Sequence, residues 1–361
     1  MRGAVRIRVR RILALTVLLL VADTCLSFAQ AMLRPSNVGF GVRAVEWLRD
    51  NGAAGLVSEV EHVYYSLNAP ATGGPALRTL PKVGAASARG VAPPAIAPVI
   101  EPALPGEGVW HGTGPLVGGA SPVLVTTFRP DPNYPQMVAG VAWIDMARAS
   151  LALYPGRYEP PNDGNQPAEI PPLLRGGLLA TFNAGFKLED SGGGFFVGGQ
   201  AYAPLRDGQA TLIAYQNGTV DVRTWTGGPV PGAGVVFARQ NLPLIVSRGQ
   251  LAGNLSDGPE WGATLGNAVR VWRSGVGVDA HGNLLYAAAD LQTAPSLAQI
   301  LQRAGAVRAM ELDINSEWVT FNFYGAWGAA DPQRLLPDMT RDATRYLTPD
   351  DRDFFAVYAR H

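Results

Sequence analysis

The residues best suited to chemistry lie at positions 307–318, where polar and apolar side chains alternate. Glu311, Asp313 and Asn315 occupy every second position, which is typical of a β-strand with one polar and one apolar face. Residues two apart on a strand are separated by about 6.5 Å, within the range of paired carboxylates that cleave glycosides. The pattern therefore predicts two carboxyl groups and an amide on one face. A solvent-facing polar stripe is the alternative interpretation.

The elements that must position these residues are mostly predicted strands. A helix is predicted at 296–304, with Pro295 near its start and Gly305 where a C-terminal cap belongs. We expect the α+β class, a mixed β-sheet domain with few helices. Short apolar or alternating runs bounded by turn residues predict strands at 123–128, 138–144, 151–154, 178–186, 211–215, 220–225, 235–238, 242–246, 276–278 and 284–286.

Composition excludes several classes of protein. Of 361 residues, 47% are hydrophobic and 16% charged, which is enough apolar material for a large core. Lys+Arg and Asp+Glu number 29 each, so no global field attracts nucleic acid, and we expect no nucleic-acid partner. The single cysteine, Cys25, excludes an intramolecular disulfide framework.

The first 33 residues predict a signal peptide or a signal anchor. Several arginines, from Arg2 to Arg11, precede an apolar run at 12–22. Residues 29–31 (Ala-Gln-Ala) form a candidate cleavage site, while continuation of the apolar run to Leu33 gives a segment long enough to span a bilayer. Both interpretations place the rest of the chain outside the cytoplasm, because the arginines stay inside.

Three further regions follow along the chain. Residues 34–67 predict a short helical segment, divided at Asn51-Gly52. Residues 68–108 are rich in Pro, Ala and Gly, which predicts a linker or a strap over the domain surface. The main domain is expected at 109–361.

Motifs for several other chemistries are missing from the sequence. The four histidines are scattered and form no His-Glu-x-x-His pattern, so we expect no zinc site. A Ca²⁺ ion held by carboxylates such as Asp313 or Asp279 stays open. There is no Gly-x-Ser-x-Gly elbow and no complete dinucleotide fingerprint.

Between about residues 128 and 324, the order of short sequence blocks resembles the phosphodiester glycosidase family. This family includes the enzyme that uncovers mannose 6-phosphate by removing N-acetylglucosamine. The blocks are 183–186 (Asn-Ala-Gly-Phe), 193–196 (Gly-Gly-Phe-Phe), 273–278 (Arg-Ser-Gly-Val-Gly-Val), 281–282 (His-Gly), the helix 296–304, and 312–313 (Leu-Asp). After Asp313 the family's run of glycines is replaced here by residues 314–318 (Ile-Asn-Ser-Glu-Trp).

The resemblance implies roles for particular residues. Asp313 is the candidate nucleophile or base, with a loop-capping aspartate as the alternative. Glu311 is the candidate partner carboxylate, and an ion pair with Arg308 or Arg303 is its alternative. Arg273 is a candidate for holding phosphate bidentately, against a scaffold salt bridge.

Further candidates for contact with the substrate are less specific. Asn183 suits a sugar hydroxyl or a phosphate oxygen, or else caps a turn. Trp318 is suited to stacking on a sugar ring. The glycines Gly193 and Gly194 let backbone N–H groups approach a ligand, although such runs are more often turns. Arg239 and its neighbour Asn241 are weaker candidates.

These expectations combine into one functional hypothesis with two rivals. We expect an exported or membrane-anchored hydrolase that cleaves a glycosyl phosphodiester or related glycosidic bond in cell-envelope polysaccharide. The first rival is a non-catalytic envelope-glycan binding protein, motivated by the replaced glycine run. The second is a membrane-anchored scaffold with a Pro-rich stalk.

Overall fold

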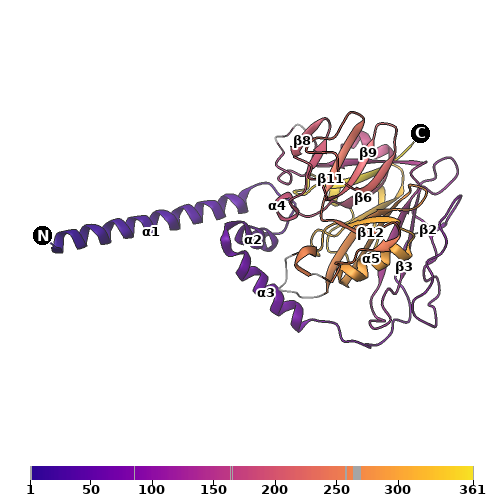
Figure 1. Cartoon of the computed structure of the whole chain (residues 1–361), viewed down its shortest axis with the longest axis horizontal. Coiled ribbons are helices and arrows are strands. Elements are labelled where there is room, and N and C mark those ends of the chain that lie inside the picture. Colours follow the sequence, from indigo (N-terminus) through magenta and orange to yellow (C-terminus); the bar gives the residue numbers. More distant parts are fainter. Residues whose placement is uncertain are drawn as a thin grey trace. The chain divides into compact units, whose positions relative to one another are not determined.

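The structure is a computed structural model that describes residues 2–84, 86–162, 164, 166–256, 258–262 and 270–360. It divides into two compact units, Met1–Glu61 and His62–His361. Figure 1 shows the chain from the indigo N-terminal helices to the yellow C-terminal strands.

The first unit is helical. Helix α1 (Arg2–Leu33) contains an apolar stretch, Val9–Leu33, whose length and composition suffice to cross a membrane. Helix α2 (Phe40–Leu48) is followed by a π-helical turn, η1 (Arg49–Ala53), and by α3 (Ala54–Leu67), whose last turns belong to the second unit. Gly52 has a φ of +86°, so the helical path breaks at Asn51-Gly52, where the break was expected.

In the second unit, the described residues form three sheets. The first runs in spatial order β1 (Ala86–Ser87), β2 (His111–Gly112), β3 (Val123–Phe128), β4 (Ala139–Ile144), β15 (Leu284–Gln292), β14 (Val271–Val278), β16 (Arg308–Glu311), β12 (Leu244–Ser247) and β13 (Gln250–Leu251). The second runs β10 (Val220–Thr224), β9 (Ala210–Tyr215), β11 (Val235–Gln240), β7 (Phe195–Val197) and β8 (Gln200–Ala203). The third runs β18 (Ala330–Arg334), β17 (Phe321–Ala326), β6 (Leu178–Asn183), β19 (Phe354–Ala359) and β5 (Ala149–Tyr154).

The helices of this unit are short. They are α4 (Leu188–Ser191), α5 (Ala294–Arg303) and the 3₁₀ turns η2 (Pro172–Gly177), η3 (Gly258–Trp261) and η4 (Arg345–Leu347). Helix α5 begins at a capping box, in which Thr293 and Ser296 exchange hydrogen bonds, and Gly305 follows it with a φ of +99°. The helix predicted at 296–304 is therefore confirmed.

The α+β class is also confirmed, with one difference in detail. Every ladder between the named strands is antiparallel, whereas we expected a mixed sheet. Antiparallel order follows directly where hairpins such as β14–β15 join consecutive strands, and the described residues contain few of the helical crossovers that parallel neighbours require.

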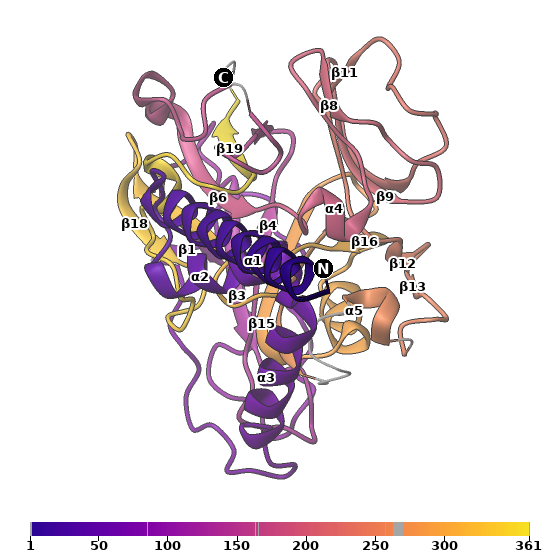
Figure 2. The ribbon, with the colours of Figure 1, turned by 90° about the vertical axis from the view of Figure 1, so that its left-hand side faces the viewer.

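The first sheet is buried on both faces. Along β15, Leu284 and Tyr286 belong to the core between the sheets, whereas Leu285 and Ala287 pack on the face that α5 covers. This alternation is the two-residue period of a strand. Figure 2 shows α5 beside β12 and β16, with the ribbons of β8, β9 and β11 forming a separate group.

The Pro-rich segment packs on the second unit through defined contacts. Val83 and Ile96 are buried, and the Trp110 indole N–H donates to the Pro94 carbonyl at 3.0 Å. Arg129 pairs with Glu107 at 2.7 Å, and both side chains are almost fully buried. A Cβ on Gly108 would lie 2.0 Å from the Ile96 carbonyl oxygen, so this close approach requires glycine. Residues 83–84 and 86–108 therefore form a strap on the domain surface.

The strand predicted at 307–318 is wrong in its second half. Strand β16 ends at Glu311, and residues 312–320 form a loop with a turn at 316–318. Glu311 and Asp313 therefore do not share one strand face, because the ladder with β14 ends at the Gly275–Glu311 pair.

Candidate functional site

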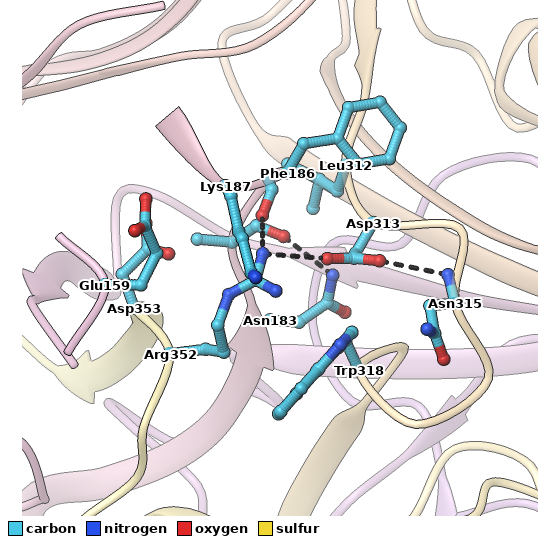
Figure 3. A network of polar contacts seen from close by, with 12 residues as sticks. Glu159, Asn183, Phe186, Lys187, Leu312, Asp313, Asn315, Trp318, Arg352 and Asp353 are labelled. Atoms are coloured by element: carbon cyan, nitrogen blue, oxygen red, sulfur yellow. Dashed lines mark hydrogen bonds and ion pairs between the residues drawn. The ribbon is translucent and has the colours of Figure 1, made fainter. Parts of the chain in front are cut away.

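Asp313 begins the loop after β16, and its carboxyl group is held from two sides (Figure 3). The Arg352 Nη2 donates to Oδ2 at 3.1 Å, and the Asn315 backbone N–H donates to Oδ1 at 3.0 Å. The second contact is an Asx turn, in which the aspartate caps its own loop. Asp313 is 4% exposed, so its orientation is set by the protein rather than by solvent.

Arg352 lies just before β19 and is itself held in place. Its Nη2 also donates to the Gly185 carbonyl at 3.1 Å, and its guanidinium carbon lies 5.0 Å from the centroid of the Trp318 ring. A stacked and hydrogen-bonded guanidinium has few other orientations available. Arg352 consequently fixes the direction of the Asp313 carboxylate.

Trp318 was expected to stack on a sugar ring. In the structure it is 5% exposed, and the guanidinium groups of Arg341 and Arg345 lie 5.9 and 5.3 Å from its ring centroid, in addition to that of Arg352. The indole ring thus supports three arginines. Its geometry is that of a positioning side chain, and sugar stacking stays a prediction that requires this loop to open.

Asn183 ends β6 and is connected to Asp313 through Ser274. Its Nδ2 donates to the Ser274 hydroxyl at 3.0 Å, and that hydroxyl donates to the Asp313 carbonyl at 2.8 Å. The Asn183 Oδ1 accepts from the Tyr286 hydroxyl and the Thr320 N–H at 2.9 and 3.0 Å. Since the Nδ2 also donates to the neighbouring carbonyl of residue 184, both donors and both acceptor positions of this amide make hydrogen bonds within the protein.

Glu311 and Arg273 form an ion pair with each other. Arg273 also donates to the carbonyls of Gln292 and Trp261, at 3.0 and 3.1 Å. Glu311 is fully buried, and burial raises its pKa, although the charge and hydrogen bond of Arg273 oppose the rise. This arrangement matches the scaffold salt bridge that was the alternative for Arg273.

The remaining residues predicted from the sequence are also engaged within the protein. The Gly193 and Gly194 N–H groups donate to the Ser191 hydroxyl and the Gln240 side chain, at 3.2 and 2.9 Å. Arg239 is 1% exposed and pairs with Asp353 at 2.7 Å.

Asn241 supports the loop that carries Asp313. Its Nδ2 donates to the carbonyls of Glu311 and Leu312 at 2.8 and 3.1 Å. The structure therefore brings Asn183, Asn241 and Asp313 into one network of contacts. It places the Glu311–Arg273 pair on the face of the first sheet that α5 covers. Met310 belongs to the core between the sheets, and its neighbour Glu311 points to the opposite face of the strand.

Sequence reasoning missed the charged segment 350–353 (Asp-Asp-Arg-Asp), whose four residues are all buried. Arg352 pairs with Asp313, Asp353 with Arg239, and Asp350 with Arg345 through bonds of 2.7 and 3.0 Å. One signal was available in the sequence. Four consecutive charged residues directly before an apolar run are unusual in a chain that is only 16% charged.

Sequence reasoning also missed Glu159 and Lys187. Figure 3 shows Glu159 and Asp353 together, on the side of Arg352 away from Asp313, and Lys187 beside Arg352. Burial raises the pKa of the Glu159 carboxyl, and Asp353 adds to the rise, while the Leu188 N–H, Arg352 and Arg239 oppose it. The Leu188 N–H donates to Glu159 Oε1 at 2.6 Å.

For metal binding, the described residues contain no group of three or more His, Cys, Asp or Glu side chains arranged to hold an ion. Asp279, named as a calcium candidate, accepts from the Trp143 indole at 3.0 Å and from the N–H groups of His281 and Asn283. It organises the turn between β14 and β15 and lies on that hairpin rather than beside Asp313.

The fold and the site together define an α+β domain of layered antiparallel sheets with a buried carboxylate–arginine cluster at the end of a central strand. Residues 176–313 match the sequence model of the phosphodiester glycosidase family, which is a family of hydrolases. The resemblance predicted from the sequence is confirmed over these residues, which are similar to the phosphodiester glycosidase domain. The match begins just before β6 and ends at Asp313.

Two similar solved structures share little sequence with the chain. One is the catalytic domain of zebrafish N-acetylglucosamine-1-phosphodiester alpha-N-acetylglucosaminidase, auto-inhibited by its pro-peptide, with 15% identity, a TM-score of 0.46, and coverage of 66% of this chain and 84% of that one. The other is a hypothetical protein from Synechocystis, with 16% identity, a TM-score of 0.39, and coverage of 68% and 64%. No curated protein matches the chain.

Proposed function

We propose that the chain is a hydrolase that cleaves a glycosyl phosphodiester, or a related glycosidic bond, in cell-envelope polysaccharide outside the cytoplasm. The observation that carries the proposal is the family match, which ends at the aspartate whose carboxylate the structure orients. The extracytoplasmic location follows from the basic flank of the apolar helix α1.

The chemistry needs a carboxylate at the sugar and a cation at the phosphate. Cleavage of the bond between C1 and oxygen develops positive charge on the sugar, which a carboxylate stabilises as nucleophile or base. We assign this role to Asp313. The phosphate monoester leaves as an anion, and its negative charge is best met by a guanidinium or ammonium group.

The cation originally assigned to the phosphate was Arg273. Because Arg273 is engaged by Glu311 and by two backbone carbonyls, we assign this role to Lys187, which is half-buried and lies beside Arg352 in Figure 3. Arg352, which is engaged by Asp313 and by the Gly185 carbonyl, keeps the role of orienting the aspartate. Glu311 then serves the scaffold rather than the reaction.

Glu159 is the proposed source of a proton for the leaving oxygen. A general acid must hold its proton near neutral pH, and burial raises the pKa of the Glu159 carboxyl in that direction. Glu159 is half-buried rather than fully enclosed. Its replacement by glutamine should reduce the rate most for substrates whose leaving group is a poor one.

The decisive experiment measures sugar release from a sugar 1-phosphodiester by the purified full-length chain in detergent. Asp313→Asn should lower kcat by about 10²–10⁴-fold. Because it leaves the buried Arg352 guanidinium without its counter-ion, it should also lower the thermal unfolding temperature, so kcat is compared at a temperature where both proteins are folded. Asp221→Asn, which alters an ion pair with Arg308 on another strand, is the matched control and should keep full activity. Activity retained in Asp313→Asn would refute the assigned role.

A second candidate is an envelope-glycan binding protein without turnover. It is favoured by the low exposure of Asp313 and Trp318, at 4% and 5%, and by the residues 314–318 that stand in place of the family's glycines. Glycan binding by the wild-type protein, with no released sugar under any substrate tested, would support it.

A further inference from the structure

Helix α2 folds back onto the C-terminal end of helix α1. The Trp47 indole N–H donates to the Ser27 hydroxyl at 3.1 Å, and its ring lies 5.1 Å from that of Phe28, edge to face. Phe40 contacts the same Phe28 ring at 6.3 Å. The Arg43 guanidinium donates to the carbonyls of Ala31, at 2.9 Å, and Met32. An arginine thus caps carbonyl groups that the helix end leaves unpaired.

The exposed surface of this helix pair is apolar. Along α1, side chains such as Leu19 and Leu26 are 69% and 58% exposed, and partial cover begins only near Ser27, where α2 packs. On α2, Phe40 and Leu48 are 64% and 38% exposed. Twenty-five helical residues span about 37 Å, which exceeds the roughly 30 Å hydrocarbon core of a bilayer.

The ends of the apolar stretch differ in a way that a bilayer explains. Arginines flank its N-terminal end, as expected for the cytoplasmic side. Aromatic residues of both helices gather at the other end, and tryptophan is enriched at the level of the lipid headgroups. A short helix with exposed apolar side chains at this level suits the membrane interface.

We propose that α1 is retained as a membrane anchor and that α2 lies in the outer interface of the same phospholipid bilayer, packed on the end of α1. The surface formed by α1 and by Phe40, Val45 and Leu48 is then covered by lipid. This inference is independent of the proposed hydrolase activity, because it uses only residues of the first unit.

The packing of α2 also bears on the candidate cleavage site at residues 29–31. These residues are helical, Ala29 and Ala31 are partly covered while Gln30 is exposed, and the carbonyl of Ala31 accepts from Arg43. Proteases cut preferentially at exposed, flexible segments. The helix pair therefore protects the bond after Ala31, and the anchor stays on the protein.

The first test is the mass and location of the full-length chain, tagged at its C-terminus and expressed in bacterial cells. We expect a product that keeps the arginine-rich N-terminus and stays with the membranes after carbonate extraction. A soluble product that begins at Met32 would overturn the proposal.

The second test places an environment-sensitive fluorophore on α2 by maleimide labelling in phospholipid vesicles. In a Cys25→Ser background, the label on Leu48→Cys should be quenched by lipids that carry a nitroxide, and the label on Gln216→Cys, an exposed site in the second unit, should not. Absence of quenching at Leu48→Cys would overturn the interfacial placement. If the unlabelled Leu48→Cys protein forms disulfide-linked dimers while its labelled form is not quenched, this surface pairs two copies of the chain instead.

The third test separates protection by packing from protection by sequence. The double variant Arg43→Ala, Trp47→Ala removes the hydrogen bonds to α1 and the Trp47–Phe28 ring contact, and we expect a cleaved product to accumulate. Arg49→Ala is the matched control, since Arg49 pairs with Glu61 and not with α1. A double variant that is as intact as the wild type would overturn the claim that α2 shields the site.

Discussion

Asn183 and Asp313 are separated by a single hydroxyl group, that of Ser274, which accepts from the Asn183 amide at 3.0 Å and donates to the Asp313 carbonyl at 2.8 Å. The last residue of β6 is thereby tied to the first residues of the loop after β16. The asparagine that was expected to touch substrate instead acts on the position of the aspartate.

Loss of this connection should affect activity more than stability when only the hydroxyl is removed. We expect Ser274→Ala to lower kcat with little change in KM, because the Asp313 loop loses one anchor. Asn183→Ala leaves the buried Thr320 N–H without its acceptor and the Tyr286 hydroxyl with only the longer bond to the Thr320 carbonyl, so it should lower the free energy of unfolding by about 1–3 kcal/mol. Urea unfolding and steady-state kinetics on both variants test the distinction; equal stability loss in both would contradict it.

The indole of Trp318 should be required for the position of Arg352 rather than for sugar binding. Trp318→Ala removes a buried aromatic ring from beside three arginines and should lower the free energy of unfolding by about 3–5 kcal/mol. Trp318→Phe keeps an aromatic face and should lose less stability, with KM for the sugar phosphodiester nearly unchanged. A large rise in KM for Trp318→Phe, at wild-type stability, would favour sugar stacking instead.

Asp290 gives a pH dependence that does not involve the site. Burial raises its pKa from the ordinary 3.8 to about 6, the Leu291 N–H opposes the rise, and Asp338 adds to it. The folded protein therefore binds this proton more tightly than the unfolded chain does. The contribution of the bound proton to the free energy of unfolding is complete below about pH 4 and is lost as the pH rises through about 6. Asp290→Asn should unfold at a higher temperature than the wild type at pH 8, and the difference should vanish toward pH 4.

Glu107 should hold the strap in place until it is protonated. Burial by itself raises its pKa, but Arg129 and the N–H groups of Leu104 and Arg129 outweigh burial and lower the pKa below the ordinary 4.5. A lowered folded-state pKa means stability that is present above about pH 4.5 and is lost on acidification. Glu107→Ala, which leaves Arg129 buried without its partner, should cost about 3–5 kcal/mol. Limited proteolysis at neutral pH should then cut within residues 83–108, where the wild type resists.

Much of the fold could be predicted because strand and helix periods are local properties of the sequence. Apolar runs such as those of β3 and β6 gave correct strands, and Pro295 with Gly305 marked helix α5. The strand after Val307 was extended too far for a local reason as well. The Asp313 side chain accepts from the Asn315 N–H and so turns the chain out of the ladder, although the alternation of side chains continues in the sequence.

The partners in the site could not be predicted in the same way. Arg352 meets Asp313 across 39 positions of sequence, and Arg239 meets Asp353 across 114. The alternation of side chains along a strand carries no information about which distant charged residue will pair with them. The resemblance to a family named Arg273 and Asp313 together, but Arg273 pairs with Glu311 at the end of β16, whereas Asp313 lies in the following loop and pairs with Arg352.

The order of the strands in the third sheet determines which residues must be kept together when this domain is excised or fused to another protein. The segment that matches the family ends at Asp313, yet β6 within it lies between β17 and β19, which come later in the chain, and the arginine that orients Asp313 immediately precedes β19. Excised as a module, residues 176–313 would expose both edges of β6 and leave their terminal aspartate without its counter-ion. A fusion or transplant that respects the fold must carry the chain through to the last strand.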